Sequence, residues 1–230
     1  MSKFHVIIPA AGSGSRMGSQ IPKQYLLLGG RPLIQTTLAV FVNCPRISSL
    51  TLVISPEDQL WDDANIPLAD KVKLVRQGGA TRAATVLNGL HALQEQAQPD
   101  DWILVHDAAR PGLSAAMLNQ LLDTLKDDAI GGLLAVPLAD TLKRADHEQR
   151  VASTEPRDGL WLAQTPQMFR YDLLKRALIA CGDKPTDEAQ AVEALGFKPK
   201  LVAGELRNLK ITYPQDLVLA EAILRAECAE

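Results

Sequence analysis

The chain has 230 residues, of which 47% are hydrophobic and 22% are charged, and it carries a formal net charge of -3. This length and apolar content are enough for one large α/β domain and short for two, while the small net charge excludes the global basic field of a nucleic-acid-binding protein. The cysteines (Cys44, Cys181 and Cys228) are scattered, no apolar run approaches the roughly 20 residues of a membrane span, and the N-terminus lacks the form of a signal peptide. We therefore expect a soluble cytoplasmic protein without nucleic-acid or membrane partners.

Short apolar runs alternate with helix-periodic stretches along the chain. The apolar runs predict strands over residues 4–9, 50–55, 71–76, 102–106 and 130–137. Helices are predicted to begin with Pro32 at the first helical position, to cover residues 81–93, to follow a Ser114 cap, and to begin again at Pro214. This order favours a doubly wound α/β fold with a largely parallel sheet, in which ligands bind beyond the carboxyl ends of the strands.

The first predicted strand leads into a glycine-rich loop over residues 9–23, with the sequence PAAGSGSRMGSQIPK. Glycines let the backbone approach a ligand and expose its N–H groups, and Arg16 and Lys23 add charge that can hold phosphate. The loop is neither a P-loop, which ends in Gly-Lys-Ser/Thr, nor a dinucleotide fingerprint, because Met17 stands where the third glycine belongs. A plain turn with surface charges is the alternative, but the spacing favours a phosphate cradle in an enzyme that handles a nucleotide.

Asp107 follows the fourth predicted strand, and Arg110 lies three residues further on. A carboxylate in this place is suited to bind a ribose hydroxyl, or to hold Mg²⁺ directly or through water, with helix capping as the alternative. His106 points to the opposite side of an extended chain from Asp107, which indicates a structural histidine rather than a base. The other histidines are scattered and form no recognisable metal set.

Residues 138–159 break the alternating pattern. The segment is polar and densely charged, and it has no helical stripe of apolar side chains. Such a run is usually a solvated loop, but a structureless loop of this length without a function is uncommon. The residues alone predict only a segment that cannot bury itself.

Several blocks, in order along the chain, resemble the 2-C-methyl-D-erythritol 4-phosphate cytidylyltransferase family of the non-mevalonate isoprenoid pathway. The first is Ala10-Ala-Gly-x-Gly-x-Arg-Met with Pro22-Lys-Gln, and the others lie at residues 105–111, 136–143, 165–169, 186–189 and 208–212. The resemblance covers essentially the whole chain. It implies one nucleotidyltransferase domain, residues 1–230, with the Rossmann-like, doubly wound, mostly parallel fold of the nucleotide-diphospho-sugar transferases. It also implies that residues 138–159 form a protruding dimerisation arm, exchanged between the subunits of a homodimer.

The implied reaction joins two anions. A phosphate oxygen of 2-C-methyl-D-erythritol 4-phosphate attacks the α-phosphorus of CTP in line, giving 4-diphosphocytidyl-2-C-methyl-D-erythritol and pyrophosphate, with Mg²⁺ expected to accompany CTP. Positioning and fixed positive charge do most of the work in such a transfer. Neither a covalent nucleophile nor a general base is required, which agrees with the lack of a Gly-x-Ser-x-Gly elbow and of a convincing Cys/His pair.

The family motifs imply roles for individual residues of this chain. Arg16 and Lys23 are expected to grip the triphosphate and stabilise charge at the α-phosphorus, and Arg157 and Lys210 to orient the second substrate. Arg157 and Thr141 lie on the arm, so they are expected to act on the neighbouring subunit's site. The expected nucleotide-binding residues are Ala10, Ala11, Gly12, Gly14, Gly79, Arg82, Thr85 and Asp107, and the expected residues for the second substrate are Arg110, Thr141, Thr165 and Thr186.

Some of these assignments depend entirely on the resemblance. Without it, Arg157 reads as a turn residue, and Lys210 lies in a predicted short strand, 209–212, where a lone charge usually faces solvent. The segment that begins at Gly78-Gly79 resembles the family's base-recognition loop. In it, Ala80 cannot supply a side-chain acceptor, whereas Thr85 retains a hydroxyl that can complement a base.

Three other functions stay open at this point. A pentitol-phosphate cytidylyltransferase, or another sugar-phosphate nucleotidylyltransferase, shares the glycine loop and the fold. A Rossmann oxidoreductase needs the missing third glycine and an acidic residue after the second strand, for which residues 55–57 offer only a displaced candidate. A non-catalytic nucleotide sensor need not keep cations for two substrates, so the presence of Arg16, Lys23 and Lys210 speaks against it.

Overall fold

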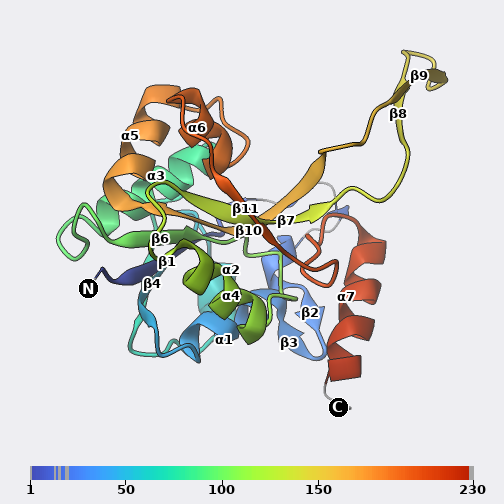
Figure 1. The fold of residues 1–230 in the computed structure, drawn as a ribbon. Coiled ribbons are helices and arrows are strands. Elements are labelled where there is room, and N and C mark those ends of the chain that lie inside the picture. The colour runs from blue at the N-terminus through green and yellow to red at the C-terminus, as the bar shows by residue number, and fades with distance from the viewer. Residues whose placement is uncertain (1, 13, 15–16, 19–20, 228–230) are drawn as a thin grey trace.

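The computed structural model describes residues 2–12, 14, 17–18 and 21–227. Within these residues, a seven-stranded sheet in the order β11-β7-β10-β6-β1-β4-β5 forms the centre of the molecule (Figure 1). Its strands are β1 (Phe4–Pro9), β4 (Ile47–Val53), β5 (Val72–Val75), β6 (Trp102–Val105), β7 (Gly131–Pro137), β10 (Trp161–Arg170) and β11 (Lys200–Ala203). A small hairpin of β2 (Leu27–Leu28) and β3 (Arg31–Pro32) lies outside this sheet.

Most neighbouring strands of the sheet run parallel, which confirms the predicted sheet type. β1 pairs in parallel with β4 and β6, β4 with β5, and β11 with β7, whereas β10 runs antiparallel between β6 and β7. The register places Val6 of β1 opposite Leu50 and Leu104, and all three side chains are fully buried. Apolar runs are needed here because both faces of the sheet are covered.

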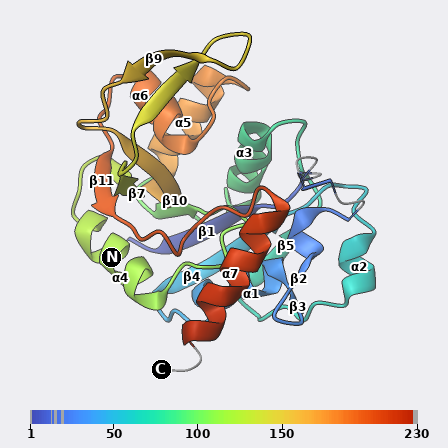
Figure 2. The same ribbon diagram turned by 90° about the vertical axis from the view of Figure 1, so that its right-hand side faces the viewer.

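Helices cover both faces, as a doubly wound fold requires (Figure 2). α1 and α4 pack on one face around Phe41 and Leu118, and α3, α5 and α6 pack on the other around Leu90, Leu174 and Val192. Among the described residues, no helix has the length and apolar content needed to cross a membrane. The helices are α1 (Leu33–Val42), α2 (Leu60–Ala64), α3 (Arg82–Ala92), α4 (Ala115–Leu125), α5 (Tyr171–Cys181), α6 (Glu188–Ala194) and α7 (Pro214–Glu227).

Local sequence signals set the starts of several helices. The side chains of Ser114 and Thr81 each accept a hydrogen bond, 3.1 Å long, from a backbone N–H three residues further on, and so cap α4 and α3. Pro214 is the first residue of α7, as predicted. Pro32 was predicted at the first position of a helix but lies one residue before α1, because its ψ of 134° is extended rather than helical.

The prediction of a strand over residues 209–212 was wrong. The N–H of Ile211 donates to the carbonyl of Ala109 over 2.9 Å, and the N–H of Thr212 donates to the side chain of Asp216 over 2.9 Å. These bonds tie the segment to the loop after β6 and to α7 instead of to a strand. Lys210 therefore projects from an irregular segment that lies beside the carboxyl ends of the central strands.

Residues 138–159 leave the body of the protein as a hairpin of β8 (Leu142–Ala145) and β9 (Val151–Glu155), which pair antiparallel. Figure 1 shows this hairpin projecting away from the sheet, and its side chains are almost all exposed. Apolar side chains are among them, with Val151 65% exposed near the tip and Leu160, Trp161 and Leu162 39–50% exposed at the base. The segment does not bury itself against the rest of the chain, as its composition predicted.

Candidate active site

The loops that follow β1, β5 and β6 meet at one edge of the sheet and enclose an open cavity of about 310 Å³. This edge is formed by the carboxyl ends of neighbouring parallel strands, where a doubly wound fold places its ligands. The short 3₁₀ helix η2 (Lys23–Tyr25) and the segment before α7 complete the wall. The residues predicted to bind the nucleotide that line the cavity are Ala10, Ala11, Gly12, Gly14, Lys23, Gly79, Arg82, Thr85 and Asp107.

Glycines let the loops of the wall approach one another closely. A Cβ on Gly78 would lie 2.3 Å from the side chain of Ala11, and a Cβ on Gly79 would lie 2.5 Å from that of Ala84. Gly14 has a φ of +69°, in the left-handed region that favours glycine. A side chain at Gly78 would push apart the glycine-rich loop after β1 (the first loop) and the Gly78-Gly79 loop, and one at Gly79 would displace the start of α3, so either would change the shape of the cavity.

The first loop is held to the end of β1 by η2. The side-chain amide of Gln24 is buried and donates to the carbonyl of Ala10 over 2.9 Å. Its neighbour Lys23 lines the cavity, and its Nζ donates to the carbonyl of Ile211 over 3.0 Å. Arg16, the other predicted catalytic cation of this loop, lies outside the described residues.

Asp107 is the acidic residue of the cavity lining, and cations surround it. One carboxylate oxygen lies 3.0 Å from Nε of Arg82, and the other lies 2.9 Å from Nζ of Lys210 and 3.5 Å from Nε of Arg110. Burial by itself raises the pKa of Asp107, but the charges of Arg82, Lys210 and Arg110 outweigh it and hold the pKa well below its usual range. The carboxylate is therefore ionised at neutral pH.

The alternative role of Asp107 as a helix cap is not what the structure shows. The residue lies in a turn after β6, and the next helix, α4, begins at Ala115 with Ser114 as its cap.

Arg82 is also held by Glu188, whose two carboxylate oxygens lie 2.6 and 3.1 Å from the terminal nitrogens of Arg82. The sequence placed Lys210 and Arg82 in the site but did not predict that both would pair with Asp107.

Apart from Lys210, the residues predicted to bind or orient the second substrate are not part of the cavity lining. Arg110 and Thr165 lie behind Asp107, where Arg110 donates to the carbonyls of Asn208 and Ala163 over 2.6 and 3.3 Å. Thr186 lies just before α6, exposed to solvent. Thr141 and Arg157 lie on the arm, where Arg157 donates to the carbonyl of Ala139.

His106 is fully buried and has partners for both ring nitrogens. Its Nε2 lies 3.0 Å from the carbonyl of Arg110, which can only accept, so Nε2 carries the proton and Nδ1 accepts from the hydroxyl of Thr165 over 3.0 Å. The same hydroxyl accepts from the N–H of Asp107 over 3.0 Å. His106 does not line the cavity, so its role is to position the loop that carries Asp107, in agreement with the structural role predicted for it.

The buried state of His106 predicts a pH-dependent stability. Burial lowers its pKa to about 4 from 6.5, so between these values the unfolded chain binds a proton that the folded protein does not. The free energy of unfolding should therefore fall as the pH is lowered from 6.5 to 4, by up to about 1.4 kcal/mol per pH unit from this one residue. Urea unfolding of the wild type and of His106→Gln at several pH values measures this pH dependence of the free energy of unfolding.

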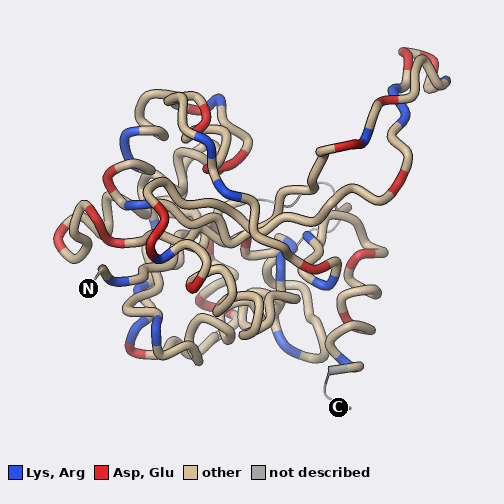
Figure 3. Tube along the Cα trace, viewed as in Figure 1, with Lys and Arg blue, Asp and Glu red and all other residues tan. Residues whose placement is uncertain are grey.

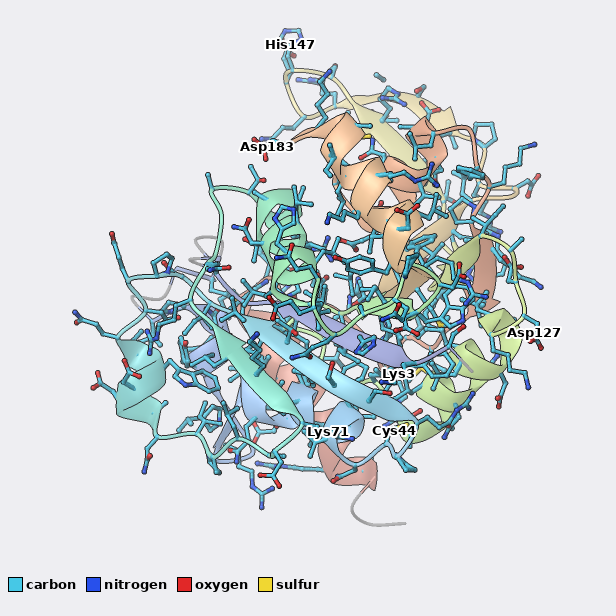
Figure 4. The ribbon with its side chains drawn as sticks, turned by 90° about the vertical axis from the view of Figure 1, so that its left-hand side faces the viewer. Lys3, Cys44, Lys71, Asp127, His147 and Asp183 are labelled. Carbon is cyan, nitrogen blue, oxygen red and sulfur yellow. The ribbon has the colours of Figure 1, made fainter. Side chains whose placement is uncertain are left out.

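The variant should be less stable at pH 7 and should lose less stability than the wild type between pH 6.5 and 4. His147→Gln, which removes an exposed histidine of the arm (labelled in Figure 4), is the matched control and should keep the wild-type slope. An unchanged slope in His106→Gln would show that His106 is not the group that takes up the proton.

Basic and acidic residues are interspersed along the chain, including the arm (Figure 3), and the net charge is only -3, so attraction for an anionic ligand depends on the cations that line the cavity. Among the described residues, no group of three or more His, Cys, Asp or Glu side chains is arranged to hold a metal ion. Among the lining residues that the structure describes, Asp107 alone offers a carboxylate. A divalent cation in this site would take most of its ligands from a bound triphosphate and from water.

The chain is similar to known proteins over nearly its full length. The model of the family "2-C-methyl-D-erythritol 4-phosphate cytidylyltransferase" matches residues 4–226. Relatives of that name from Dechloromonas aromatica and Nitrosospira multiformis are 60% and 56% identical to it, and each match covers 98% of this chain and 99% of the relative. A crystal structure of 4-diphosphocytidyl-2C-methyl-D-erythritol synthase has a TM-score of 0.86 at 42% identity, covering 97% of this chain and 99% of the other. The crystal structure of the Francisella tularensis 2-C-methyl-D-erythritol 4-phosphate cytidylyltransferase has a TM-score of 0.84 at 36% identity, covering 96% of this chain and 100% of the other.

Proposed function

The chain belongs to the 2-C-methyl-D-erythritol 4-phosphate cytidylyltransferase family, and we propose that the cavity described above is where its two substrates react. The enzyme transfers the cytidylyl group of CTP to 2-C-methyl-D-erythritol 4-phosphate and releases pyrophosphate; the pentitol-phosphate alternative is not favoured. The observation that carries the proposal is the meeting of the first loop, the Gly78-Gly79 loop, Asp107, Lys23 and Lys210 around one cavity.

In this proposal CTP lies with its triphosphate over the first loop and its base at the Gly78-Gly79 loop. The hydroxyl of Thr85 accepts from the N–H of Gly79 over 3.0 Å and donates to the carbonyl of Thr81 over 2.9 Å. Because that hydroxyl is already used to shape the loop, the cytosine is recognised by backbone groups rather than by Thr85. A close backbone wall also excludes a larger purine base.

The chemistry follows from where the cations lie. Lys23, with Arg16 from the same loop, neutralises charge that gathers on the α-phosphoryl group as the incoming phosphate oxygen bonds to it and the pyrophosphate oxygen leaves. Lys210 also lines the cavity, held 2.9 Å from Asp107, and in this proposal it meets the phosphate of the second substrate. Asp107 binds the ribose. Arg110 and Thr165 act indirectly, because they support Asp107 from behind.

A Mg²⁺ ion fits this site as a companion of the triphosphate. Asp107 is the residue that would hold it, through water, since Arg82 and Lys210 already occupy its oxygens. The ion would supply charge neutralisation to the triphosphate.

We further propose that the enzyme is a homodimer that exchanges its arms. Support comes from the exposed apolar side chains of the arm, including Trp161 and Leu162, which a second subunit would cover. In a dimer of this kind, Arg157 and Thr141 reach the neighbour's cavity, and Thr186 completes the second-substrate site. The two apolar clusters on the faces of one sheet support a single domain, residues 1–230, that bears this arm.

We place the enzyme in the cytoplasm. The described cysteines, Cys44 and Cys181, are free thiols, which suits a reducing compartment. Its substrates, a nucleoside triphosphate and a sugar-alcohol phosphate, are charged metabolites that do not cross membranes unaided.

Arm exchange predicts complementation between inactive subunits. Arg16→Ala and Arg157→Ala are each expected to be inactive, but a mixed dimer has one site in which both arginines are present. Random mixing makes about half of the dimers mixed, so activity should recover to about a quarter of the wild-type value. Pyrophosphate release after subunit exchange, confirmed by mass spectrometry of the intact dimer, measures it.

The matched control mixes Arg16→Ala with Lys23→Ala. Both residues lie on the first loop of the same subunit, so no mixed dimer contains an intact site and activity should stay at the level of the single variants. No recovery in the Arg16/Arg157 mixture, despite proven exchange, would contradict a site shared between subunits.

The activity itself is tested by measuring pyrophosphate release with CTP, UTP, ATP and GTP, each with and without 2-C-methyl-D-erythritol 4-phosphate. Release should require CTP and that substrate together. Replacing it by ribitol phosphate or other sugar phosphates should reduce release strongly. Equal rates of release with a pentitol phosphate would indicate a pentitol-phosphate cytidylyltransferase instead.

A further inference from the structure

Glu188 is a fully buried carboxylate outside the cavity lining. It is the first residue of α6, and its two oxygens lie 2.6 and 3.1 Å from the terminal nitrogens Nη1 and Nη2 of Arg82. A buried carboxylate needs a matched partner, and this two-bond arrangement is the one that an arginine fork supplies. The two residues are 106 positions apart in the chain, and no family block predicted their contact.

Arg82 is shared between Glu188 and the cavity. Its remaining donor nitrogen, Nε, binds Asp107 over 3.0 Å, and its side chain is 26% exposed where it lines the cavity. Both edges of the planar guanidinium are thus occupied by carboxylates, which fixes its plane. In this state Arg82 has no free pair of donors for a phosphate, and its role is to hold Asp107.

The contacts form a continuous chain of alternating charges, Glu188–Arg82–Asp107–Lys210, with distances of 2.6, 3.0 and 2.9 Å. The chain connects α6, α3, the loop after β6 and the segment before α7. Removing the charge of Glu188 would leave Arg82 with Asp107 as its sole described carboxylate partner and free the guanidinium to rotate. Asp107, and Lys210 beyond it, would then lose a fixed position.

Glu188 is not required to build α6. Asp187 caps the helix by accepting from the N–H of Gln190, the side chain of Gln167 accepts from the N–H of Ala189 over 2.7 Å, and buried Val192 packs into the core. Asp183, at the turn after α5 (labelled in Figure 4), separately joins this region to α3 by accepting from the hydroxyl of Thr81 over 2.6 Å. The helix has its own anchors, so the contact with Arg82 has another function.

We propose that Glu188 is a positioning residue for the nucleotide pocket: it fixes Arg82 so that Asp107 is held ready for the ribose of CTP. The inference rests on the function proposed above for the cavity. It assigns a part in nucleotide binding to a side chain that touches neither substrate.

The test measures CTP affinity by calorimetry in the absence of the second substrate, for the wild type, Glu188→Gln and Glu188→Asp. Glu188→Gln keeps the shape of the side chain but removes its charge, and the Kd for CTP should rise by about 10- to 100-fold, as when other residues that orient a functional group are changed. Glu188→Asp keeps the charge but is shorter, so the rise should be smaller. Glu193→Gln, an exposed glutamate on the same helix, is the control and should bind CTP like the wild type.

A double-variant measurement separates positioning from a general structural role. If Glu188 acts through Arg82, then adding Glu188→Gln to Arg82→Gln should cause no further loss of CTP binding. A further loss of the same size would overturn the proposal, as would wild-type affinity in Glu188→Gln. If Glu188→Gln does not fold, the same comparison is made with Glu188→Asp, alone and combined with Arg82→Lys. Wild-type affinity for CTP in Glu188→Asp would overturn the proposal. It would also be overturned if Glu188→Asp weakened CTP binding by the same factor in the Arg82→Lys background as in the wild type.

The outcomes also distinguish this inference from the function on which it rests. If Asp107→Ala weakens CTP binding and Glu188→Gln does not, the pocket stands and the role of Glu188 fails. If Asp107→Ala leaves CTP binding unchanged while the protein stays folded, the pocket assignment itself fails.

Discussion

Replacing Lys23 by alanine should lower kcat by about 10²- to 10³-fold, which is the typical cost of removing one group that stabilises charge in a transition state. Lys23 lines the cavity beside Gly14, and η2 holds it there through the bond from Gln24 to the end of β1. Its backbone position does not depend on its side chain, so the fold should be kept. Steady-state pyrophosphate release, with circular dichroism as a check on folding, measures the effect.

Lys126→Ala provides the matched control, because this lysine is exposed just after α4 and away from the cavity. Its kcat should equal that of the wild type. Arg16→Ala, in the same loop as Lys23, should cause a loss of similar size. Wild-type turnover in a folded Lys23→Ala enzyme would remove Lys23 from the catalytic step.

Alanine at Lys210 or at Arg157 should impair use of 2-C-methyl-D-erythritol 4-phosphate far more than it impairs binding of CTP. Each substitution removes one cation proposed to meet the second substrate's phosphate, so kcat/KM for that substrate should fall by about 10²-fold or more. In Lys210→Ala, Asp107 keeps Arg82 and Arg110 as partners, so the nucleotide side of the cavity should stay in place. The Kd for CTP should therefore change by less than about threefold.

Calorimetric titration with CTP and steady-state kinetics with varied second substrate separate the two effects. Lys143→Ala is the control for Arg157→Ala, because Lys143 is an exposed basic residue of the same hairpin, and its Nζ donates to the hydroxyl of Thr154 over 2.7 Å. It should retain wild-type kinetics. An equal loss of CTP binding and of second-substrate use in either active-site variant would show that the residue belongs to the nucleotide site.

The sequence predicted the strands β1, β4, β5, β6 and β7, and it predicted which loops lie together at the cavity. β1, β6 and β7 were recognisable because strands buried on both faces need uninterrupted apolar runs. The cavity residues were recognisable because a glycine loop with fixed cations carries its function in local sequence. The family model and relatives confirm the resemblance stated on those blocks.

β10 was missed for a physical reason. Its centre contains Gln164, Thr165 and Gln167, which are all buried and whose polar groups bind the segment around Asn208, the loop at His106 and the start of α6. Polar residues in a central strand remove the apolar run from which a strand is predicted. The same residues position Asp107 and α6, so the part of the fold hardest to predict is the part that supports the site.

The pairing of charges within the site could not be predicted either. Arg82, Asp107, Glu188 and Lys210 come from four separate regions of the chain, and which carboxylate meets which cation depends on how those regions pack. The sequence shows which residues are charged, but the fold determines which of them form ion pairs. The same holds for the arm, whose apolar side chain Val151 is exposed in one subunit and finds its proposed role only in a second.

The central claim is that CTP binds with its triphosphate over the first loop, in reach of the cations at the carboxyl edge of the sheet. A crystal structure of the enzyme with CTP and Mg²⁺ tests it most directly. We expect phosphate oxygens within hydrogen-bonding distance of Lys23 Nζ and of the backbone N–H groups of Gly12 and Gly14, with the cytosine against Gly79. A nucleotide bound at another face of the protein, with Lys23 still turned to Ile211, would contradict it.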